Sequence, residues 1–183
     1  MSELSIRYAT ALVDLAKEEN KLDEYYNYLN SFISFFNEND ELNDFFASFK
    51  INTKTKQDFI NKHFNNLYNE NFLNFLYLIL KNGRGNKIYL ILKDSLKLFE
   101  DELNIERGVI YSSKKLNDNY LNRIVESFKK KLNKRVVLKN EIDPSLIGGI
   151  KIVLRNDIYD ASIKNKLDNL KKMLIKGENW YGH

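Results

Sequence analysis

The stretch Phe72-Leu73-Asn74-Phe75-Leu76-Tyr77-Leu78-Ile79-Leu80 is the densest apolar segment of the chain. A helix drawn through it is apolar around most of its circumference, so neighbouring helices have to cover most of its sides. It is much shorter than the roughly 18 to 20 residues that a membrane-spanning helix needs. The stretch therefore predicts the central helix of a bundle. That helix should end at Asn82-Gly83, because glycine readily adopts the left-handed conformation that terminates helices.

The segments on either side of this stretch are amphipathic. Apolar residues recur at steps of three and four with polar residues between them, which is the period of a helix, and many of them are aromatic. Thr55 and Asp58 have the spacing of a capping box at a helix start. We expect six short helices up to about residue 103, with inward-facing stripes at Leu4–Leu15, Leu22–Phe36, Leu42–Phe49, Phe59–Leu67, Phe72–Leu80 and Ile88–Leu103.

The pattern changes near Arg107-Gly108 from helical stripes to short β-branched runs. The order strand, helix, strands, helix is typical of a small α/β unit. We predict a mostly α chain: a six-helix bundle over residues 1–105, followed by a small α/β domain over residues 106–183. The expected strands lie at Val109–Tyr111, Arg135–Leu138, Leu146–Leu154 and Ile158-Tyr159, and the expected helices at Leu121–Leu132 and Ile163–Leu174.

Charge is distributed unevenly along the chain. Residues 1–105 carry 12 basic and 16 acidic side chains, a net charge of −4, whereas residues 106–183 carry 17 and 9, a net charge of +8. Two parts with fields of opposite sign attract different partners. This asymmetry indicates two separate binding tasks.

The sequence offers little for chemistry. It has no cysteine, and its two histidines, His63 and His183, lack the spacing of metal ligands. Gly83-Arg84-Gly85 lacks the ending of a phosphate-binding loop, and Gly148-Gly149 is more typical of a bulge or a close backbone contact. We expect no catalytic residues, no cofactor and no metal. The N-terminus does not resemble an export signal, so we expect a reducing, cytosolic setting.

Two other classes of protein remain as alternatives. The basic stretch Lys129, Lys130, Lys131, Lys134 and Arg135 would support an RNA-binding module if it formed one face. Lysines near a helix C-terminus are also favoured by the helix dipole, so the stretch alone does not predict nucleic-acid binding. An enzyme is the weaker alternative, because no nucleophile, base and oxyanion donor come together in the pattern.

Three stretches resemble the delta subunit of bacterial F-type ATP synthases, which is related to the mitochondrial oligomycin-sensitivity-conferring protein. They are Arg7–Ala16 with its Tyr-Ala pair, Leu76 through Asn82-Gly83-Arg84, and Ile142–Ile150 followed by Tyr159–Ile163 and Leu167. Their order spans almost the whole chain and agrees with a bundle followed by an α/β unit. The chain departs from the family at Ala161, where glycine is usual, and in the extension Gly177–His183.

The resemblance implies a non-catalytic stator subunit that links the catalytic head to the peripheral stalk and resists the torque of the rotor. The bundle would bind the N-terminal helix of an alpha subunit, and the C-terminal part would bind a b-type stalk subunit. Such a subunit is peripheral, at the cytoplasmic face of the bacterial plasma membrane, and reaches the membrane only through its complex. From the charges we expect a basic partner segment for the bundle and an acidic stalk end for the remainder.

The resemblance also places the alpha-binding groove on the first and fifth helices. It implies partner contacts by seven residues, each of which is equally compatible with packing inside the bundle: Tyr8, Ala11, Leu12, Leu15, Leu76, Ile79 and Leu80.

Overall fold

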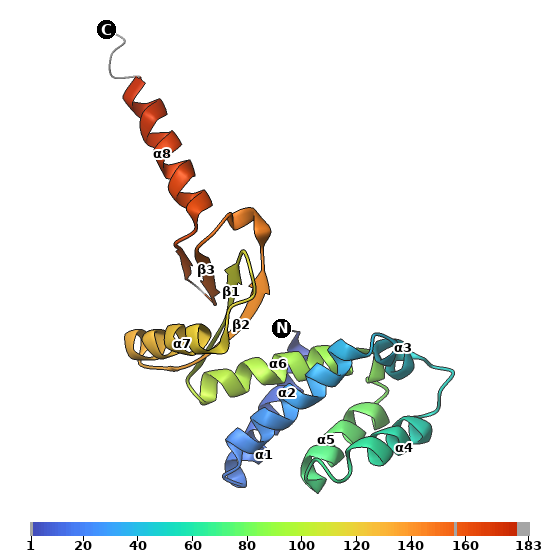
Figure 1. Ribbon diagram of the computed structural model, residues 1–183. Helices are drawn as coiled ribbons and strands as arrows, with labels where there is room; N and C mark the ends of the chain where they lie inside the picture. The colour runs from blue at the N-terminus through green and yellow to red at the C-terminus, as the bar shows by residue number, and fades with distance from the viewer. Residues whose placement is uncertain (1, 156, 179–183) are drawn as a thin grey trace. The chain divides into compact units, whose positions relative to one another are not determined.

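The computed structural model describes residues 2–155 and 157–178, and the chain divides into two compact units (Figure 1). The first unit ends at Leu103 and the second begins at Asn104, close to the boundary at residue 105 that the sequence predicts. Most of the C-terminal extension, residues 179–183, lies outside the described residues.

Residues 2–103 form a helical bundle, as predicted. Its elements are α1 (Glu3–Glu18), α2 (Leu22–Glu38), α3 (Glu41–Ala47), α4 (Thr53–Phe64), α5 (Glu70–Lys81), the 3₁₀ turn η1 (Gly85–Lys87) and α6 (Ile88–Glu102).

Polar side chains cap the starts of several of these helices. The Ser2 hydroxyl accepts a hydrogen bond from the Ser5 N–H at 3.2 Å, and the Ser5 hydroxyl accepts one from the Ser2 N–H at 3.0 Å. The predicted capping box of Thr55 and Asp58 is wrong, because α4 begins earlier. The cap is Asn52, whose side-chain oxygen accepts from the Thr55 N–H at 2.7 Å, and asparagine is among the best residues for that position.

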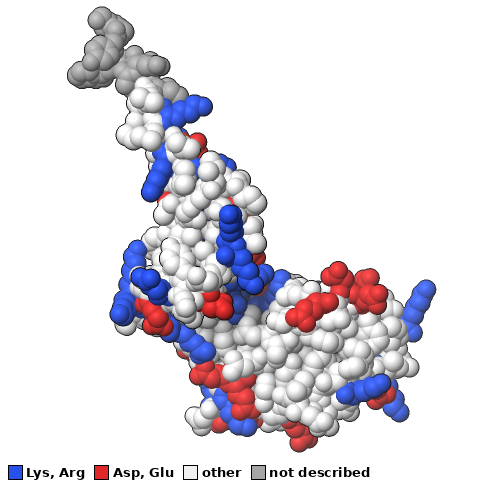
Figure 2. Space-filling model, in the orientation of Figure 1, with Lys and Arg blue, Asp and Glu red and all other residues white. Residues whose placement is uncertain are grey.

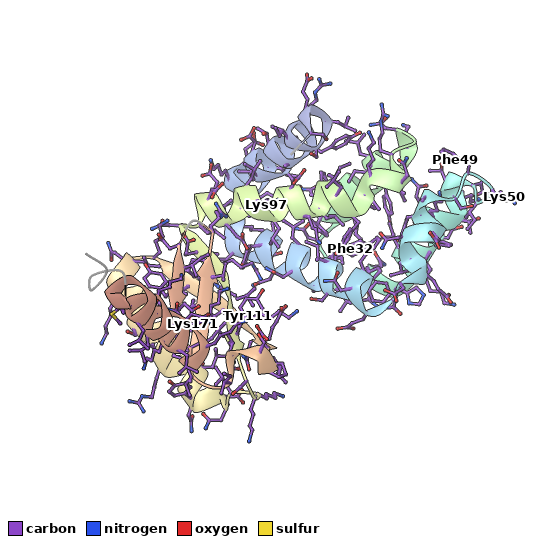
Figure 3. All side chains as sticks on the ribbon, turned by 90° about the horizontal axis from the view of Figure 1, so that it is seen from above. Phe32, Phe49, Lys50, Lys97, Tyr111 and Lys171 are labelled. Carbon is purple, nitrogen blue, oxygen red and sulfur yellow. The ribbon has the colours of Figure 1, made fainter. Side chains whose placement is uncertain are left out.

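Aromatic rings fill the bundle core. Phe32 points between the helices (Figure 3), and its ring centroid lies 4.8 Å from that of Phe64 and 5.5 Å from that of Phe36. Large side chains of this kind supply most of the hydrophobic stabilisation available to a small unit. The largest fully buried aromatic residues are Tyr25, Phe32, Phe36, Phe46, Phe72 and Phe99.

Two predicted inward-facing residues lie at the surface instead. Phe49 is 91% exposed at the outer edge of the bundle (Figure 3), and Leu67 is 63% exposed. Both follow the end of a helix, so the helical period no longer turns them inward. The ammonium of Lys56 donates to the carbonyl oxygens of Phe46 and Ser48 at 2.7 Å each, which satisfies carbonyls at the end of α3. Burial lowers the pKa of this lysine.

The second unit is an α/β fold. In the described residues it contains β1 (Ile105–Ser112), α7 (Asp118–Leu132), β2 (Arg135–Ile142), the 3₁₀ turn η2 (Pro144–Leu146), β3 (Ile150–Leu154), β4 (Ile158–Asp160) and α8 (Ile163–Glu178). The four strands pair in the order β2-β1-β3-β4, with β1 and β2 parallel and the other pairs antiparallel. The crossover helix α7 packs on one face of this sheet around Ile110, Val136, Leu138, Ile152 and Leu154.

The predicted strand at Leu146–Leu154 begins later than expected, at Ile150. Gly149 has a φ of +77°, and a Cβ there would lie 2.5 Å from the carbonyl oxygen of Ala161. Gly148 and Gly149 therefore belong to a tight turn that passes close to the start of α8. Beside it, hydrogen bonding from Ser162 lowers the pKa of Asp160, whose carboxylate accepts from the Ser162 N–H at 2.9 Å.

Replacing each of two glycines by alanine distinguishes the cost of an unfavourable backbone conformation from the cost of a steric collision. Gly83 has a φ of +67° and no atom within 4 Å of the place that a Cβ would occupy, whereas a Cβ on Gly85 collides with the carbonyl oxygen of Phe46. We expect Gly83→Ala to cost about 1 kcal/mol of unfolding free energy, and Gly85→Ala to cost about 3 kcal/mol because α3 has to shift. Urea unfolding followed by helical circular dichroism measures both. Equal costs would contradict this assignment of roles.

Candidate partner-binding groove

A groove of about 510 Å³ lies between the first half of α1 and the end of α5. It combines apolar side chains with polar and basic ones, and its position along both helices brings together residues far apart in the sequence. The lining residues are Leu4, Arg7, Tyr8 and Ala11 from α1, Leu78 from α5, and Asn82 and Arg84 from the turn that follows α5.

The apolar part of the groove is formed by Leu4, Ala11 and Leu78. Leu78 is 49% exposed, although its neighbours in sequence along α5 are mostly buried. Ala11 is small and exposed, so an approaching helix can come close to the backbone of α1 at this point. An exposed leucine beside a small residue is the arrangement expected of a surface that receives an apolar anchor.

Hydrogen bonds between side chains tie α1 to α5 at two places. Within the groove the Asn82 side-chain amide donates to the Tyr8 hydroxyl at 2.9 Å, and the Tyr8 ring packs edge-on against Phe75. Outside the groove, where α1 has ended and α5 begins, the Glu19 carboxylate accepts from the side chain of Asn71. The hydrogen bond from Asn71 is the largest of the causes that lower the pKa of Glu19. These contacts set the spacing of α1 and α5 before any partner binds.

The groove is locally basic, although the first 105 residues carry a net charge of −4. It contains Arg7 and Arg84 and no acidic side chain among its lining residues. The net charge of the unit therefore does not describe the charge that a partner meets in the groove.

The structure separates the seven residues that the resemblance placed in the groove. Tyr8 and Ala11 line it, and Leu15 is half-buried outside the lining set. The other four are buried in the bundle core and are not among the lining residues, an arrangement that favours the alternative of core packing: Leu12, Leu76, Ile79 and Leu80.

Sequence reasoning missed five lining residues. Leu4 and Arg7 lie one helical turn before Tyr8 and Ala11 on the same face of α1, so the helical period was a usable signal for them. Leu78 carried no such signal, because α5 is apolar on most sides and the pattern does not tell which leucine faces outward. Asn82 and Arg84 belong to the Asn82-Gly83-Arg84 motif, which indicated a helix end rather than a groove wall.

A second exposed apolar surface runs along α8. The apolar side chains of this helix recur at steps of three and four, so they form one stripe on a helix that also carries several lysines. On the face drawn in Figure 2, basic side chains gather on the surface formed by α7 and α8. The exposed apolar residues of the stripe are Ile163, Leu167, Leu170 and Leu174.

Three of the four lysines that raised the possibility of nucleic-acid binding contact other side chains. Lys129 pairs with Glu126 at 2.6 Å, Lys134 pairs with Glu106 at 3.1 Å, and the Lys131 ammonium lies 4.0 Å from the centroid of the Tyr159 ring. These three lysines therefore make separate contacts within the protein.

The described residues contain no group of three or more His, Cys, Asp and Glu side chains that could hold a metal ion. Over the same part of the chain, no helix has the length and apolarity required to cross a membrane. His63 is exposed, and its ring lies against Phe59 with centroids 4.6 Å apart.

The model of the family described as "ATP synthase delta (OSCP) subunit" matches residues 4–174. The chain belongs to this family. ATP synthase subunit delta of Mycoplasma mobile is 36% identical over 175 residues, which cover 93% of this chain and 95% of that protein. ATP synthase subunit delta of Clostridium kluyveri is 32% identical over 176 residues, covering 96% of this chain and 97% of that protein.

The match to the delta (OSCP) family extends through both units, and both relatives are named as the delta subunit of ATP synthase. A chain in the cryo-EM structure of the Toxoplasma gondii mitochondrial ATP synthase hexamer has the same fold, with a TM-score of 0.73 at 20% identity. That similarity covers 95% of this chain and 98% of the other.

Two leucines on α5 test the division between core and groove. Leu76 is 0% exposed, so Leu76→Asp places an unpaired carboxylate in the core and should cost more than about 3 kcal/mol of unfolding free energy. Leu78→Asp, the matched control in the groove, should cost less than about 0.5 kcal/mol. Thermal unfolding followed by circular dichroism distinguishes them. A Leu76→Asp variant that is as stable as the Leu78→Asp variant would contradict this division.

Proposed function

We propose that the chain is a stator subunit of an F-type ATP synthase that holds two other subunits through its two units. The first unit binds the N-terminal helix of an alpha subunit in the groove between α1 and α5. The second unit binds a b-type subunit of the peripheral stalk. Membership of the delta (OSCP) family supports this assignment, and the groove is the observation that carries it.

The groove is suited to an amphipathic helix. Helix-in-groove recognition places apolar anchors spaced at three, four and seven residues into a furrow between two helices. Leu4, Ala11 and Leu78 provide the apolar surface for such anchors. The hydrogen bonds from Asn82 to Tyr8 in the groove and from Asn71 to Glu19 outside it hold α1 and α5 together, so the partner does not have to order the bundle when it binds.

The stripe on α8 is suited to a second helix. Its four exposed residues present an apolar strip to solvent, and such contiguous strips mark interaction surfaces. Residues 106–183 carry a net charge of +8, which favours an acidic partner. The stripe and the charge together support a stalk helix with an acidic flank as the occupant.

A stator of this kind works by binding and not by chemistry. If one unit is fixed to the catalytic head and the other to the stalk, the head cannot rotate with the rotor, and the torque is used for ATP synthesis. The subunit would be peripheral at the cytoplasmic face of the plasma membrane, with membrane contact only through the complex. Neither RNA binding nor an enzymatic activity has a comparable surface in support.

A binding experiment with a synthetic peptide of the alpha-subunit N-terminal segment from the same organism tests the groove. Leu78→Asp and Ala11→Trp should each weaken binding at least about tenfold, a loss of about 1.4 kcal/mol, because the first places a charge in the groove and the second fills it. Leu90→Asp is the matched control, since Leu90 is an exposed leucine on α6 outside the lining set. Isothermal titration calorimetry measures the affinities. Loss of binding in the control alone would place the site elsewhere.

Charge and apolar burial should contribute to different rates of binding to the stalk subunit. Raising the salt concentration should slow association of the full chain with the soluble part of the b-type subunit, because salt screens the +8 charge of residues 106–183. Leu170→Asp should instead raise the dissociation rate, because it removes an apolar contact. Stopped-flow fluorescence gives both rates. An association rate that does not change with ionic strength would contradict the proposed contribution of charge to this contact.

A further inference from the structure

Two arginines from separate elements line the groove. Arg7 is on α1, and Arg84 follows the end of α5, yet both line the same groove. The backbone of Arg84 is held by a turn of Schellman type, in which the Gly83 N–H donates to Leu80 O and the Arg84 N–H donates to Ile79 O, each at 3.0 Å. The position of Arg84 is therefore fixed by the way α5 ends.

These arginines are weakly paired in the isolated chain. Arg7 lies 3.7 Å from Glu3 across one helical turn, but both side chains are largely exposed. Such a surface pair contributes little and is readily exchanged for another. Among the described residues, Arg84 makes no ion pair within 4.0 Å, and the groove contains no carboxylate.

A third donor lines the same groove. The Tyr8 hydroxyl accepts the hydrogen bond from the Asn82 amide at 2.9 Å, which leaves its own proton available to an acceptor outside the pair. Two guanidinium groups and a phenolic O–H thus line the groove together with its apolar side chains.

We propose that the helix held in this groove carries an aspartate or glutamate whose carboxylate lies between Arg7 and Arg84. This inference rests on the proposed function and deepens it by stating the chemistry of the partner. A carboxylate that accepts from guanidinium groups forms strong, directional hydrogen bonds. The apolar anchors supply the burial, and the carboxylate fixes where along the groove the partner helix stops.

The local charge leads to a different partner from the one that the net charge indicates. A net charge of −4 over residues 1–105 favours a basic segment, but a charge in contact with its partner outweighs more distant ones that salt screens. The partner helix should therefore be acidic where it faces Arg7 and Arg84, whatever charges it carries elsewhere.

The test uses the full chain with Arg7→Gln, Arg84→Gln and both together, titrated with the synthetic alpha-subunit N-terminal peptide. The double variant should bind about tenfold more weakly, as expected for two partly exposed ion pairs. Replacing one acidic residue of the peptide by its amide should produce a similar loss with the unaltered chain. The same replacement should produce no further loss with the double variant. Lys81→Gln, an exposed lysine on α5 outside the lining set, is the matched control and should bind normally.

The outcomes distinguish this inference from the function on which it rests. If the double variant binds the peptide as tightly as the unaltered chain and with the same salt dependence, the carboxylate is refuted while the groove assignment stands. If the unaltered chain does not bind the peptide, both are refuted. Rescue of Arg84→Glu by a peptide with lysine at the identified acidic position would support the pairing directly.

Discussion

The need to cover α5 is the constraint on which the rest of the first unit depends. Its apolar side chains face several directions, so the other helices must pack around it. Six side chains of α5 are buried: Phe72, Leu73, Phe75, Leu76, Ile79 and Leu80. The bundle leaves one leucine of this helix, Leu78, half exposed beside the small residue Ala11. An incompletely covered apolar helix is a surface that a partner helix can complete.

The residues that end and tether the helices also shape this surface. Gly83 adopts the left-handed conformation and lets α5 stop where Asn82 reaches Tyr8 and Arg84 enters the groove. At the far end of α1, Glu19 holds α1 to the start of α5. A groove fixed in this way loses little conformational freedom when its partner binds, which favours a stator that has to remain attached under load.

The sequence predicted the architecture well, because periodicity and glycine positions report local structure. It predicted the bundle, the α/β unit and the helix end at Asn82-Gly83. The sequence did not predict the end of α3, which depends on tertiary packing. Lys56 satisfies carbonyls at the end of α3, and the chain has left the helix before Phe49. The helical period could not reveal this contact with a lysine of another helix. A groove does lie between the two helices that the resemblance named, but Leu76 and Leu78 cannot be told apart by pattern on a helix that is apolar nearly all round.

The proposed stator places its two tasks on two different chemistries. The first unit offers a furrow with an apolar floor and two arginines, and the second offers an apolar stripe on a lysine-rich helix. Because the surfaces belong to separate units, each partner can be bound without altering the other surface. A single subunit can then connect two parts of a larger complex.

Amide hydrogen exchange of the full chain, with and without the alpha-subunit N-terminal peptide, shows whether the partner binds between α1 and α5. We expect bound peptide to slow exchange in the first half of α1 and in the last turn of α5 through Arg84, and to leave α3, α4 and α8 unchanged. Protection confined to α3 and α4, or to the second unit, would show that the groove between α1 and α5 is not where the partner binds.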